Sequence, residues 1–404
     1  HRKGLQVLQL WGRYAHPMKK IEVLTEDGCA RLGIIRTAHG EIQTPVFMPV
    51  GTQGIVKATA PKDLQDMGIK VILANAYHLY LRPGDNLIRE MGGIHKFAGW
   101  DGSVLTDSGG YQVFSLGVLR QIKEEGVVFQ SHIDGSRHFL SPEKVVEVQE
   151  NIGADICMCL DECVPYPSSH AYTRDSVDLT SRWARRCKEA KKADDAMLFG
   201  IVQGGFYPEL RIKSAQELME MDFDGYALGG MSVGEPKSIM WEMVDTVIGS
   251  FPREKPRYLM GLGFPEDIVE GVRKGIDMFD CVIPTRHARN GSLFTRDGRI
   301  NIKHAKYVKD ESPIDDMCGC YTCKTFSRAY LRHLFVSHEL SSYHLNTIHN
   351  IYFYNSLMED IRKAIQGGTF EAFYDAFKKT WKGGELQDEH SIRDGSDAGR
   401  TGGR

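Results

Sequence analysis

The sequence predicts a (β/α)8 barrel, also called a TIM barrel, with a second and smaller module. This expectation rests on eight short apolar segments and on helical patterns between most of them. Most segments are near-continuous apolar runs, which favour strands covered on both faces, as in a parallel sheet. An open doubly wound sheet is the alternative. No G-x-G-x-x-G follows a strand and opens a helix, which weakens the dinucleotide-binding version of that alternative.

The expected strands are, in chain order, residues 46–52, 71–79, 103–109, 155–163, 197–205, 225–233, 257–263 and 278–285. The first helix is expected to begin at Ser141, an N-cap residue, with Pro142 in its first turn. Further helical patterns cover residues 173–192, 208–221, 237–249 and 265–274. Residues 111–140 are long for a strand–helix loop. Their apolar segment 127–132, followed by Asp134-Gly135, predicts a hairpin, so we expect an insertion at the barrel mouth.

The rest of the chain divides into segments of other kinds. The barrel core is expected over residues 18–285, and residues 286–382 read as a smaller, largely helical module. Residues 383–404 are rich in Gly, Asp, Ser and Arg, a composition typical of disorder. Met18 followed by two lysines resembles a natural start, so we interpret residues 1–17 as a non-native or disordered extension.

The composition is close to the globular average, with 42% hydrophobic and 25% charged residues. No stretch approaches the ~18 apolar residues of a spanning helix, so we expect no membrane partner. The nine scattered cysteines do not suit a secreted disulfide framework and indicate a reducing cytoplasm. A net charge of −3 does not by itself indicate a nucleic-acid partner, which would have to meet a local basic patch.

Three thiols lie within six residues, at Cys318, Cys320 and Cys323. Thiolates this close suit a tetrahedral site for a soft metal such as zinc. Spacing alone leaves the fourth ligand open between His333, His338, His344 and His349. Four protein ligands leave no open position, so such a zinc ion would be structural rather than catalytic. A chance cluster of free thiols is the alternative.

Polar residues end several of the expected strands. Asp107, Asp161 and Asp280 come at the ends of the third, fourth and eighth strands, and Gln203 at the end of the fifth. In a barrel these ends meet at one face, where the chemistry of the fold is found. Carboxylates that share a partly apolar site shift each other's pKa values, so acid, base and nucleophile roles can be divided among them. A helix cap or a turn is the alternative role for each aspartate taken singly.

A basic stretch follows the eighth expected strand. Between residues 282 and 309 there are seven basic residues, opposed only by Asp297. They are Arg286, Arg289, Arg296, Arg299, Lys303, Lys306 and Lys309. Such residues can contact the phosphates of a nucleic acid, and their place beside a catalytic aspartate and a metal motif favours that role over a solvated face.

Together these residues resemble the queuine tRNA-ribosyltransferase family, also called tRNA-guanine transglycosylase. The resemblance covers residues 18–382 approximately, with all its motifs in the family's order. The motifs are T-D-S-G-G-Y-Q-V-F, L-D-E-C, Q-G-G, G-G-M-S-V-G-E, Y-L-M-G-L-G, M-F-D-C-V-I-P-T-R, and C-G-C-Y-T-C with N-T-I-H-N. The resemblance implies a TIM barrel with an inserted zinc-binding subdomain.

It also implies an activity: exchange of guanine for a 7-deazaguanine base at the wobble position of tRNAs with a G-U-N anticodon. These tRNAs accept Asp, Asn, His and Tyr. Asp280 would be the nucleophile that forms a covalent intermediate with the ribose. Asp107 would be the general acid/base, and two displacements at one carbon would give net retention.

The resemblance carries further residues by position. The base would contact Ser108, Gly109, Gly110, Tyr111, Asp161, Cys163, Gln203, Gly230, Met231, Val233 and Met260, with Tyr111 and Met260 on its two faces. The anticodon loop would contact Gly261, Leu262, Gly263, Phe264, Pro265, Glu266, Asp267, Thr285, Arg286, His287, Ala288 and Arg289. One structural zinc ion per subunit would be held by Cys318, Cys320, Cys323 and His349.

Two positions address the incoming base. Cys163 and Val233 match the bacterial pattern, which implies 7-aminomethyl-7-deazaguanine rather than the bulkier queuine. Met231 departs from the usual leucine, a change that roughly conserves volume. The Arg/Gly-rich tail is not explained by the resemblance. Bacterial members are typically homodimers, so we expect a homodimer here.

Two other functions stay open at this point. A retaining glycosidase would also use a barrel and paired acids, but the basic stretch and the metal motif serve no purpose in sugar hydrolysis. A non-catalytic RNA-binding accessory subunit is the other alternative. The presence of both Asp107 and Asp280 argues against it.

Overall fold

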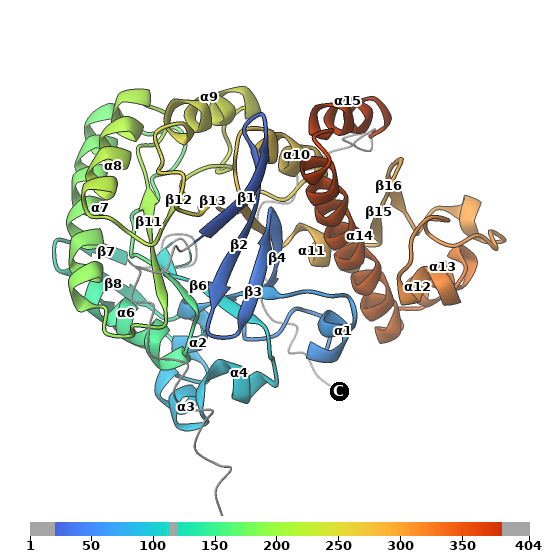
Figure 1. Cartoon of the computed structure of the whole chain (residues 1–404). Helices are drawn as coiled ribbons and strands as arrows, with labels where there is room; N and C mark the ends of the chain where they lie inside the picture. Colours follow the sequence, from blue (N-terminus) through green and yellow to red (C-terminus); the bar gives the residue numbers. More distant parts are fainter. Residues whose placement is uncertain (1–20, 111, 113–119, 382–404) are drawn as a thin grey trace, which may run out of the picture.

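The computed structural model describes residues 21–110, 112 and 120–381, and a closed barrel of eight parallel strands forms its centre (Figure 1). The strands are, in order around the barrel, β4 (Val46–Gly51), β5 (Val71–Asn75), β6 (Ser103–Asp107), β10 (Ile156–Met158), β11 (Met197–Val202), β12 (Gly225–Leu228), β13 (Arg257–Leu259) and β14 (Met278–Cys281). Each lies within one of the eight apolar segments, so the predicted fold class is confirmed. The expectations for residues 1–17, Tyr111 and 383–404 lie outside the described residues.

The strands end earlier than the apolar runs that predicted them. The segment 155–163 contributes only Ile156–Met158, and the segment 278–285 is divided between β14 and helix α11 (Ile283–Arg289). The expectation of a strand as far as residue 285 was wrong. Pro284 occupies the first turn of α11, where its missing N–H is not needed, whereas a strand ladder would need it. The expected strand 71–79 was likewise too long, because residues 76–79 belong to helix α2 (Ala76–Leu81). Most remaining residues of the other segments belong to loops at the carboxyl ends of the strands.

Helices surround the barrel. The five long ones are close to the predicted ranges: α6 (Pro142–Ile152), α7 (His170–Ala190), α8 (Pro208–Glu220), α9 (Lys237–Ile248) and α10 (Pro265–Arg273). Ser141 caps α6 as predicted, because its Oγ accepts a hydrogen bond from the Lys144 N–H at 3.2 Å. Four helices of six residues each were missed, since so few residues show no clear helical period: α1 (Pro61–Asp66), α2 (Ala76–Leu81), α3 (Asp85–Glu90) and α4 (Gly93–Ala98).

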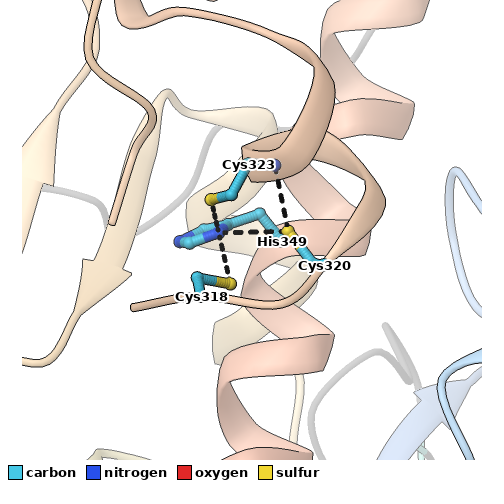
Figure 2. Close-up of side chains that lie close together, drawn as sticks. All are labelled: Cys318, Cys320, Cys323 and His349. Atoms are coloured by element: carbon cyan, nitrogen blue, oxygen red, sulfur yellow. Dashed lines mark hydrogen bonds between the residues drawn. The ribbon is translucent and has the colours of Figure 1, made fainter. Parts of the chain in front are cut away.

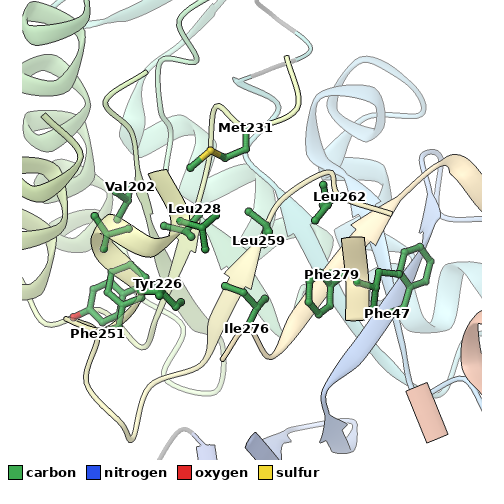
Figure 3. Packing of buried hydrophobic residues seen from close by; sticks show 14 of the residues in the cluster. Phe47, Val202, Tyr226, Leu228, Met231, Phe251, Leu259, Leu262, Ile276 and Phe279 are labelled. Atoms are coloured by element: carbon green, nitrogen blue, oxygen red, sulfur yellow. The ribbon is translucent and has the colours of Figure 1, made fainter. Parts of the chain in front are cut away.

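The apolar core has a layer between the strands and the helices, and Figure 3 shows part of it. Phe47, Leu228, Leu259 and Phe279 point outward from neighbouring strands and pack on residues of the outer helices. A second cluster fills the barrel interior, with Met48, Leu73, Leu105 and others of the strands. The interior is therefore a packed core and not a channel.

An antiparallel sheet closes one end of the barrel. Its strands are β1 (Ile21–Asp27), β2 (Ala30–Thr37) and β3 (Gly40–Thr44), which the sequence analysis did not predict. Ile21, Ile35 and Ile42 of this sheet belong to the same buried cluster as the barrel interior. Arg31 binds Asp277, which directly precedes β14, so the sheet covers the end at which the strands begin. The carboxyl ends of the strands are left as the open mouth.

Two further units complete the described chain. The predicted hairpin between β6 and α6 is present as part of a three-stranded sheet, β7 (Arg120–Lys123), β8 (Gly126–Gln130) and β9 (Arg137–Leu140). After α11 come a hairpin, a 3-10 turn and four helices: β15 (Ser292–Thr295), β16 (Gly298–Asn301), η1 (Ala305–Tyr307), α12 (Tyr321–Thr325), α13 (Arg328–Val336), α14 (Leu340–Gln366) and α15 (Phe370–Thr380). No helix among the described residues is long and apolar enough to cross a membrane.

Helix α14 joins the barrel to the module that precedes it. It packs against β1, β2 and β4 on one side and against α12, α13 and β15 on the other, as its central place in Figure 1 shows. It therefore covers the first strand of the barrel, β4, from outside. The division into domains at residue 285 stays a prediction, because α14 belongs to both parts.

The Arg31–Asp277 pair yields a stability prediction. Both side chains are buried, and Arg31 Nε donates to Asp277 Oδ1 at 3.0 Å. Arg31→Ala would leave a buried carboxylate without its cation, so we expect a loss of roughly 3–5 kcal/mol in the free energy of unfolding. Urea denaturation measures it. Arg36→Ala is the matched control, because Arg36 lies on the same strand and pairs with exposed glutamates, where ~0–1 kcal/mol is expected. Equal losses in the two variants would contradict the argument.

Candidate active site and metal centre

Asp280 lies at the open mouth, near the end of β14. Its Oδ1 accepts two hydrogen bonds, from the Tyr258 hydroxyl at 2.6 Å and from the Gly261 N–H at 2.8 Å. Burial raises the pKa of Asp280, and the two donors lower it. Burial therefore disfavours the ionised form of Asp280, and the two donors partly offset that effect.

Asp107 ends β6 at the same mouth. Its carboxyl accepts hydrogen bonds from Asn75 Nδ2 at 2.6 Å and from the Ala76 N–H at 3.2 Å. Burial raises the pKa of Asp107 to about 8, and the charges of Asp280 and Asp161 act in the same direction. Asp107 is therefore mostly protonated at neutral pH, as a group that donates a proton must be.

Asp161 and Gln203 form a buried pair beside these two aspartates. Asp161 is 7% exposed and Gln203 1%. Gln203 Nε2 donates to Asp161 Oδ2 at 2.6 Å, and Ser108 Oγ donates to Asp161 Oδ1 at 3.4 Å. Burial raises the pKa of Asp161 to about 6. Gln203 Oε1 is buried without a hydrogen-bond partner among the described residues, so it is available to a polar ligand.

Two glycine-rich loops leave no room for side chains beside this pair. A Cβ at Gly110 would lie 2.9 Å from the Asp161 carbonyl oxygen. Gly230 has φ +63°, and a Cβ there would lie 2.5 Å from Gln203 Oε1. The loops thus bring main-chain atoms directly against the polar pair, as recognition of a flat polar ligand requires.

The other residues predicted to contact a base lie around this pair. Met231 is buried, and Met260, Cys163 and Val233 are half-buried on loops that follow β13, β10 and β12. The Val233 N–H and the Ser232 N–H both donate to the Glu235 carboxylate, at 2.8 and 2.6 Å. Gly109 has φ +76° and packs directly on Tyr77. Tyr111 lies outside the described residues.

A cleft of about 930 Å³ runs from the loop after β13 to the β15–β16 hairpin. Seven of the twelve predicted RNA contacts line its wall: Gly261, Leu262, Gly263, Phe264, Asp267, Arg286 and His287. Lys237, Arg299 and His304 add further basic side chains, and Cys281 brings the cleft next to Asp280. Glu235 and Asp267 also line the cleft, and Asp267 pairs with Lys237 at 2.8 Å. The cleft thus carries several basic side chains and adjoins the aspartates.

Five of the predicted RNA contacts do not line this cleft. Ala288 is fully buried, and its carbonyl accepts from Asn346 Nδ2 at 3.4 Å. Thr285 is buried, and its carbonyl accepts from the Arg289 guanidinium at 2.9 Å. The Glu266 carboxylate accepts from the indole N–H of Trp381 at 3.0 Å. The fifth, Pro265, is buried at the first turn of α10. These five residues are close in sequence to residues of the cleft wall but do not line the cleft themselves.

The three clustered cysteines meet His349 from α14, as Figure 2 shows. Their Sγ atoms lie 3.7 Å (Cys318), 3.7 Å (Cys320) and 3.3 Å (Cys323) from His349 Nδ1. Zinc bonds of 2.3 Å to sulfur and about 2.05 Å to nitrogen would place tetrahedral ligands ~3.6 Å apart. The four side chains form a group that can hold a metal ion. Of the four histidines that spacing left open, the structure selects His349.

The second ring nitrogen of His349 is also occupied. Nε2 lies 2.7 Å from the carbonyl oxygen of Phe294, which can only accept, so Nε2 carries the proton. The lone pair of Nδ1 then faces the thiols. Histidines that bind metals commonly donate their other ring N–H to a carbonyl in this way, which fixes the tautomer and the ring orientation.

A second group, His39, His95 and Asp155, lies at the closed end of the barrel. The two imidazole rings stack 3.4 Å apart at an interplanar angle of 10°. A metal ion binds the lone pair in the plane of an imidazole, and two parallel stacked planes share no such point. The arrangement suits hydrogen bonds instead, which join His39 to one Asp155 oxygen at 2.8 Å and His95 to the other at 3.2 Å.

Comparison with known proteins identifies the family of this chain. The sequence model of the family described as queuine tRNA-ribosyltransferase matches residues 26–383. The chain belongs to this family. A queuine tRNA-ribosyltransferase of Solidesulfovibrio magneticus is 58% identical over 89% of this chain and 97% of its own. One of Pelotomaculum thermopropionicum is 56% identical, over 89% and 97%. Membership of this family does not favour the two alternative functions, a retaining glycosidase and a non-catalytic RNA-binding accessory subunit.

Several residues of the site were missed by the sequence analysis. Asn75 binds Asp107, and its place at the end of a strand, with Asn as a polar residue there, is a signal that could have found it. Tyr258 binds Asp280 from inside an apolar strand, where the sequence gives no signal. Lys237 comes from the start of α9, far along the chain from the basic stretch.

The raised pKa of Asp107 predicts a pH dependence of stability. The usual value is 3.8 and the folded value is about 8, so between them the folded chain holds a proton that the unfolded chain has released. Stability from this group therefore falls as pH rises from about 4 to about 8. Asp107→Asn abolishes the titration. We expect the Tm of the variant minus that of the wild type to increase from pH 5 to pH 8, measured by differential scanning calorimetry. A difference independent of pH would contradict the assignment.

Proposed function

We propose that this chain replaces guanine at the wobble position of tRNAs with a G-U-N anticodon by 7-aminomethyl-7-deazaguanine, as a step in queuosine biosynthesis. One observation carries the proposal: two aspartates with different hydrogen-bond partners stand beside the polar Asp161–Gln203 pair at the barrel mouth. The names of the related enzymes, queuine tRNA-ribosyltransferases, support the transfer of a base to tRNA.

In the first displacement, an oxygen of Asp280 attacks the anomeric carbon of the ribose. A bond forms between that oxygen and the carbon, and the bond from the carbon to the guanine ring nitrogen breaks. The Tyr258 and Gly261 donors hold Oδ1, which favours attack by the other oxygen. Protonated Asp107 supplies the proton that the leaving guanine takes up.

In the second displacement the incoming base attacks the same carbon and releases Asp280. Asp107, now ionised, accepts the proton that the incoming base loses, which restores the starting state of both aspartates. Two inversions give net retention, and no water is consumed. The neighbouring carboxylates suit this cycle, because the charge of Asp280 favours the protonated form of Asp107 while Asp280 is free.

Base recognition is assigned to the residues around Asp161. Its carboxylate can accept from the ring N–H and the amine of a guanine-like edge, while Gln203 and the Gly230 N–H contact the rest of that edge. Tyr111 and Met260 would cover the two faces. Val233 and Cys163, half-buried on the neighbouring loops, support the smaller aminomethyl base over queuine, since a valine side chain takes up space that a bulkier substituent needs.

The partner is the tRNA anticodon loop, whose splayed bases and phosphates fit the basic cleft beside Asp280. The metal proposed for the four-ligand group is zinc in a structural role, since three cysteines and one histidine fill a tetrahedron. A homodimer and a cytoplasmic location belong to the same proposal.

Removal of the metal tests its structural role. We expect one zinc ion per chain by elemental analysis and its loss in Cys323→Ser, because a missing thiolate opens the tetrahedron. Hydrogen exchange should then accelerate over residues 318–349 and stay slow in the barrel strands. Cys29→Ser is the control, since Cys29 is an exposed thiol outside the group. Uniform acceleration over the whole chain, or full zinc content in Cys323→Ser, would contradict a local structural site.

The central experiment is exchange of labelled guanine into an unmodified tRNA of the G-U-N class, followed by a denaturing gel. We expect label in the tRNA and an enzyme–RNA band when no incoming base is added. Asp280→Ala should lose the band and at least ~10³-fold of the rate, because the nucleophile is gone, while tRNA binding survives.

The control is the same tRNA with adenine in place of the wobble guanine, which should neither take up label nor form the band. An enzyme–RNA band that persists in Asp280→Ala would show that the nucleophile is misassigned. Normal tRNA binding by the wild type without any exchange would favour the accessory-subunit alternative.

A further inference from the structure

A buried arginine ties together two loops of the base site. Arg211, on α8, is 0% exposed. Its Nε donates to the Gly205 carbonyl at 2.9 Å, and its Nη1 to the carbonyls of Val202 and Gly229 at 3.0 and 2.7 Å. Its Nη2 donates to the Gly230 carbonyl at 3.2 Å. One rigid guanidinium plane thus bridges the end of β11 to the loop after β12.

This arginine differs from the other fully buried one described above. Arg31 is paired with a carboxylate, whereas in the described part of the chain Arg211 has main-chain carbonyls as its hydrogen-bond acceptors and no salt bridge. Burial lowers the pKa of Arg211 to about 10, which leaves it charged at neutral pH. A buried cation without an ion-pair partner is costly, so packing alone does not explain it.

A second contact from the same face of α8 fixes the first loop. Ser214, three residues beyond Arg211, accepts a hydrogen bond at its Oγ from the Gln203 N–H at 3.1 Å. The loop also lies very close to the helix, since a Cβ at Gly204 would lie 2.7 Å from the main-chain nitrogen of Arg211. The backbone of Gln203 is therefore held on both sides by α8.

The two loops that Arg211 bridges carry the groups assigned to base recognition. Gln203 lies between Val202 and Gly205, and Gly230 accepts from the arginine through its own carbonyl. A Cβ at Gly230 would lie 2.5 Å from Gln203 Oε1, so the two recognition groups are in direct contact. A small shift of either loop would change their separation.

We propose that Arg211 is a positioning residue that sets the distance between the Gln203 amide and the Gly230 N–H, and with it the affinity for the base. This inference rests on the proposed function. Arg211 acts through main-chain carbonyls and does not touch the base. Apart from Ser232 and Glu235, which follow Gly230 in the same loop, the cleft assigned to RNA is lined by residues of elements that Arg211 does not bridge, so tRNA affinity should depend on this arginine far less than base affinity does.

The test uses Arg211→Lys and Arg211→Gln in the full chain. Measured quantities are the Kd of 7-aminomethyl-7-deazaguanine by calorimetry, the KM for that base, and the KM for tRNA. We expect Kd and KM for the base to rise by about tenfold in Arg211→Lys and more in Arg211→Gln, since misplaced contacts of this kind cost one to two orders of magnitude. The KM for tRNA should stay within about twofold.

Arg31→Lys is the matched control, because Arg31 is equally buried but binds Asp277 at the closed end of the barrel. It should lower Tm and leave the KM for the base unchanged. Arg211 variants with a lower Tm and an unchanged KM for the base would overturn the proposal, because the role would then be structural. Failure of both variants to fold would overturn it for the same reason.

Rejection of the proposed function can be distinguished from rejection of the role of Arg211. A wild-type chain that does not exchange guanine would reject the function itself, whatever the variants do. A wild-type chain that exchanges guanine, with Arg211 variants that match it in base affinity, would reject only the role of Arg211.

Discussion

Hydrogen bonding between β14 and β4 is the interaction on which the rest of this molecule depends. It joins residues 278–281 to residues 46–49 and turns an open sheet into a ring. In the closed ring the carboxyl ends of all eight strands lie at one mouth. Asp107, Asp161, Gln203 and Asp280 lie at or shortly after these strand ends and become neighbours, although 173 positions separate Asp107 from Asp280. The β1–β3 sheet fills the other end, so ligands have one mouth to enter.

The chemistry of that mouth follows from the removal of water around several carboxyl groups. Burial raises the pKa of Asp107, of Asp161 and of Asp280. What distinguishes them is the set of donors that each one receives: a phenol and an amide for Asp280, an asparagine and an amide for Asp107, a glutamine and a serine for Asp161. The fold therefore tunes three identical side chains through the hydrogen-bond donors around each one, while the charges of Asp280 and Asp161 add to the raised pKa of Asp107.

The sequence predicted the barrel because buried parallel strands are apolar throughout, and it predicted the aspartates because polar residues stand out at the ends of such strands. The β1–β3 sheet was missed because only residues such as Ile35 and Ile42 face the core while charged residues separate them. Arg211 was missed for a related reason: within an amphipathic helix an arginine is expected to face solvent. The ligand His349 was ambiguous by spacing, since only the packing of α14 decides which histidine meets the thiols.

Helix α14 has a consequence for the order in which the chain is completed during synthesis. The last strand of the barrel ends at Cys281, but α14, an outer helix that packs on β4, spans Leu340–Gln366. It follows all three cysteines in the chain and contains His349. A growing chain therefore exposes the whole set of metal ligands before the barrel can acquire its last outer helix. Asn350 and Tyr354 of this helix donate hydrogen bonds to the carbonyls of Pro284 and Gly263. A metal ion held by the four-ligand group would join the three-cysteine segment to the same helix.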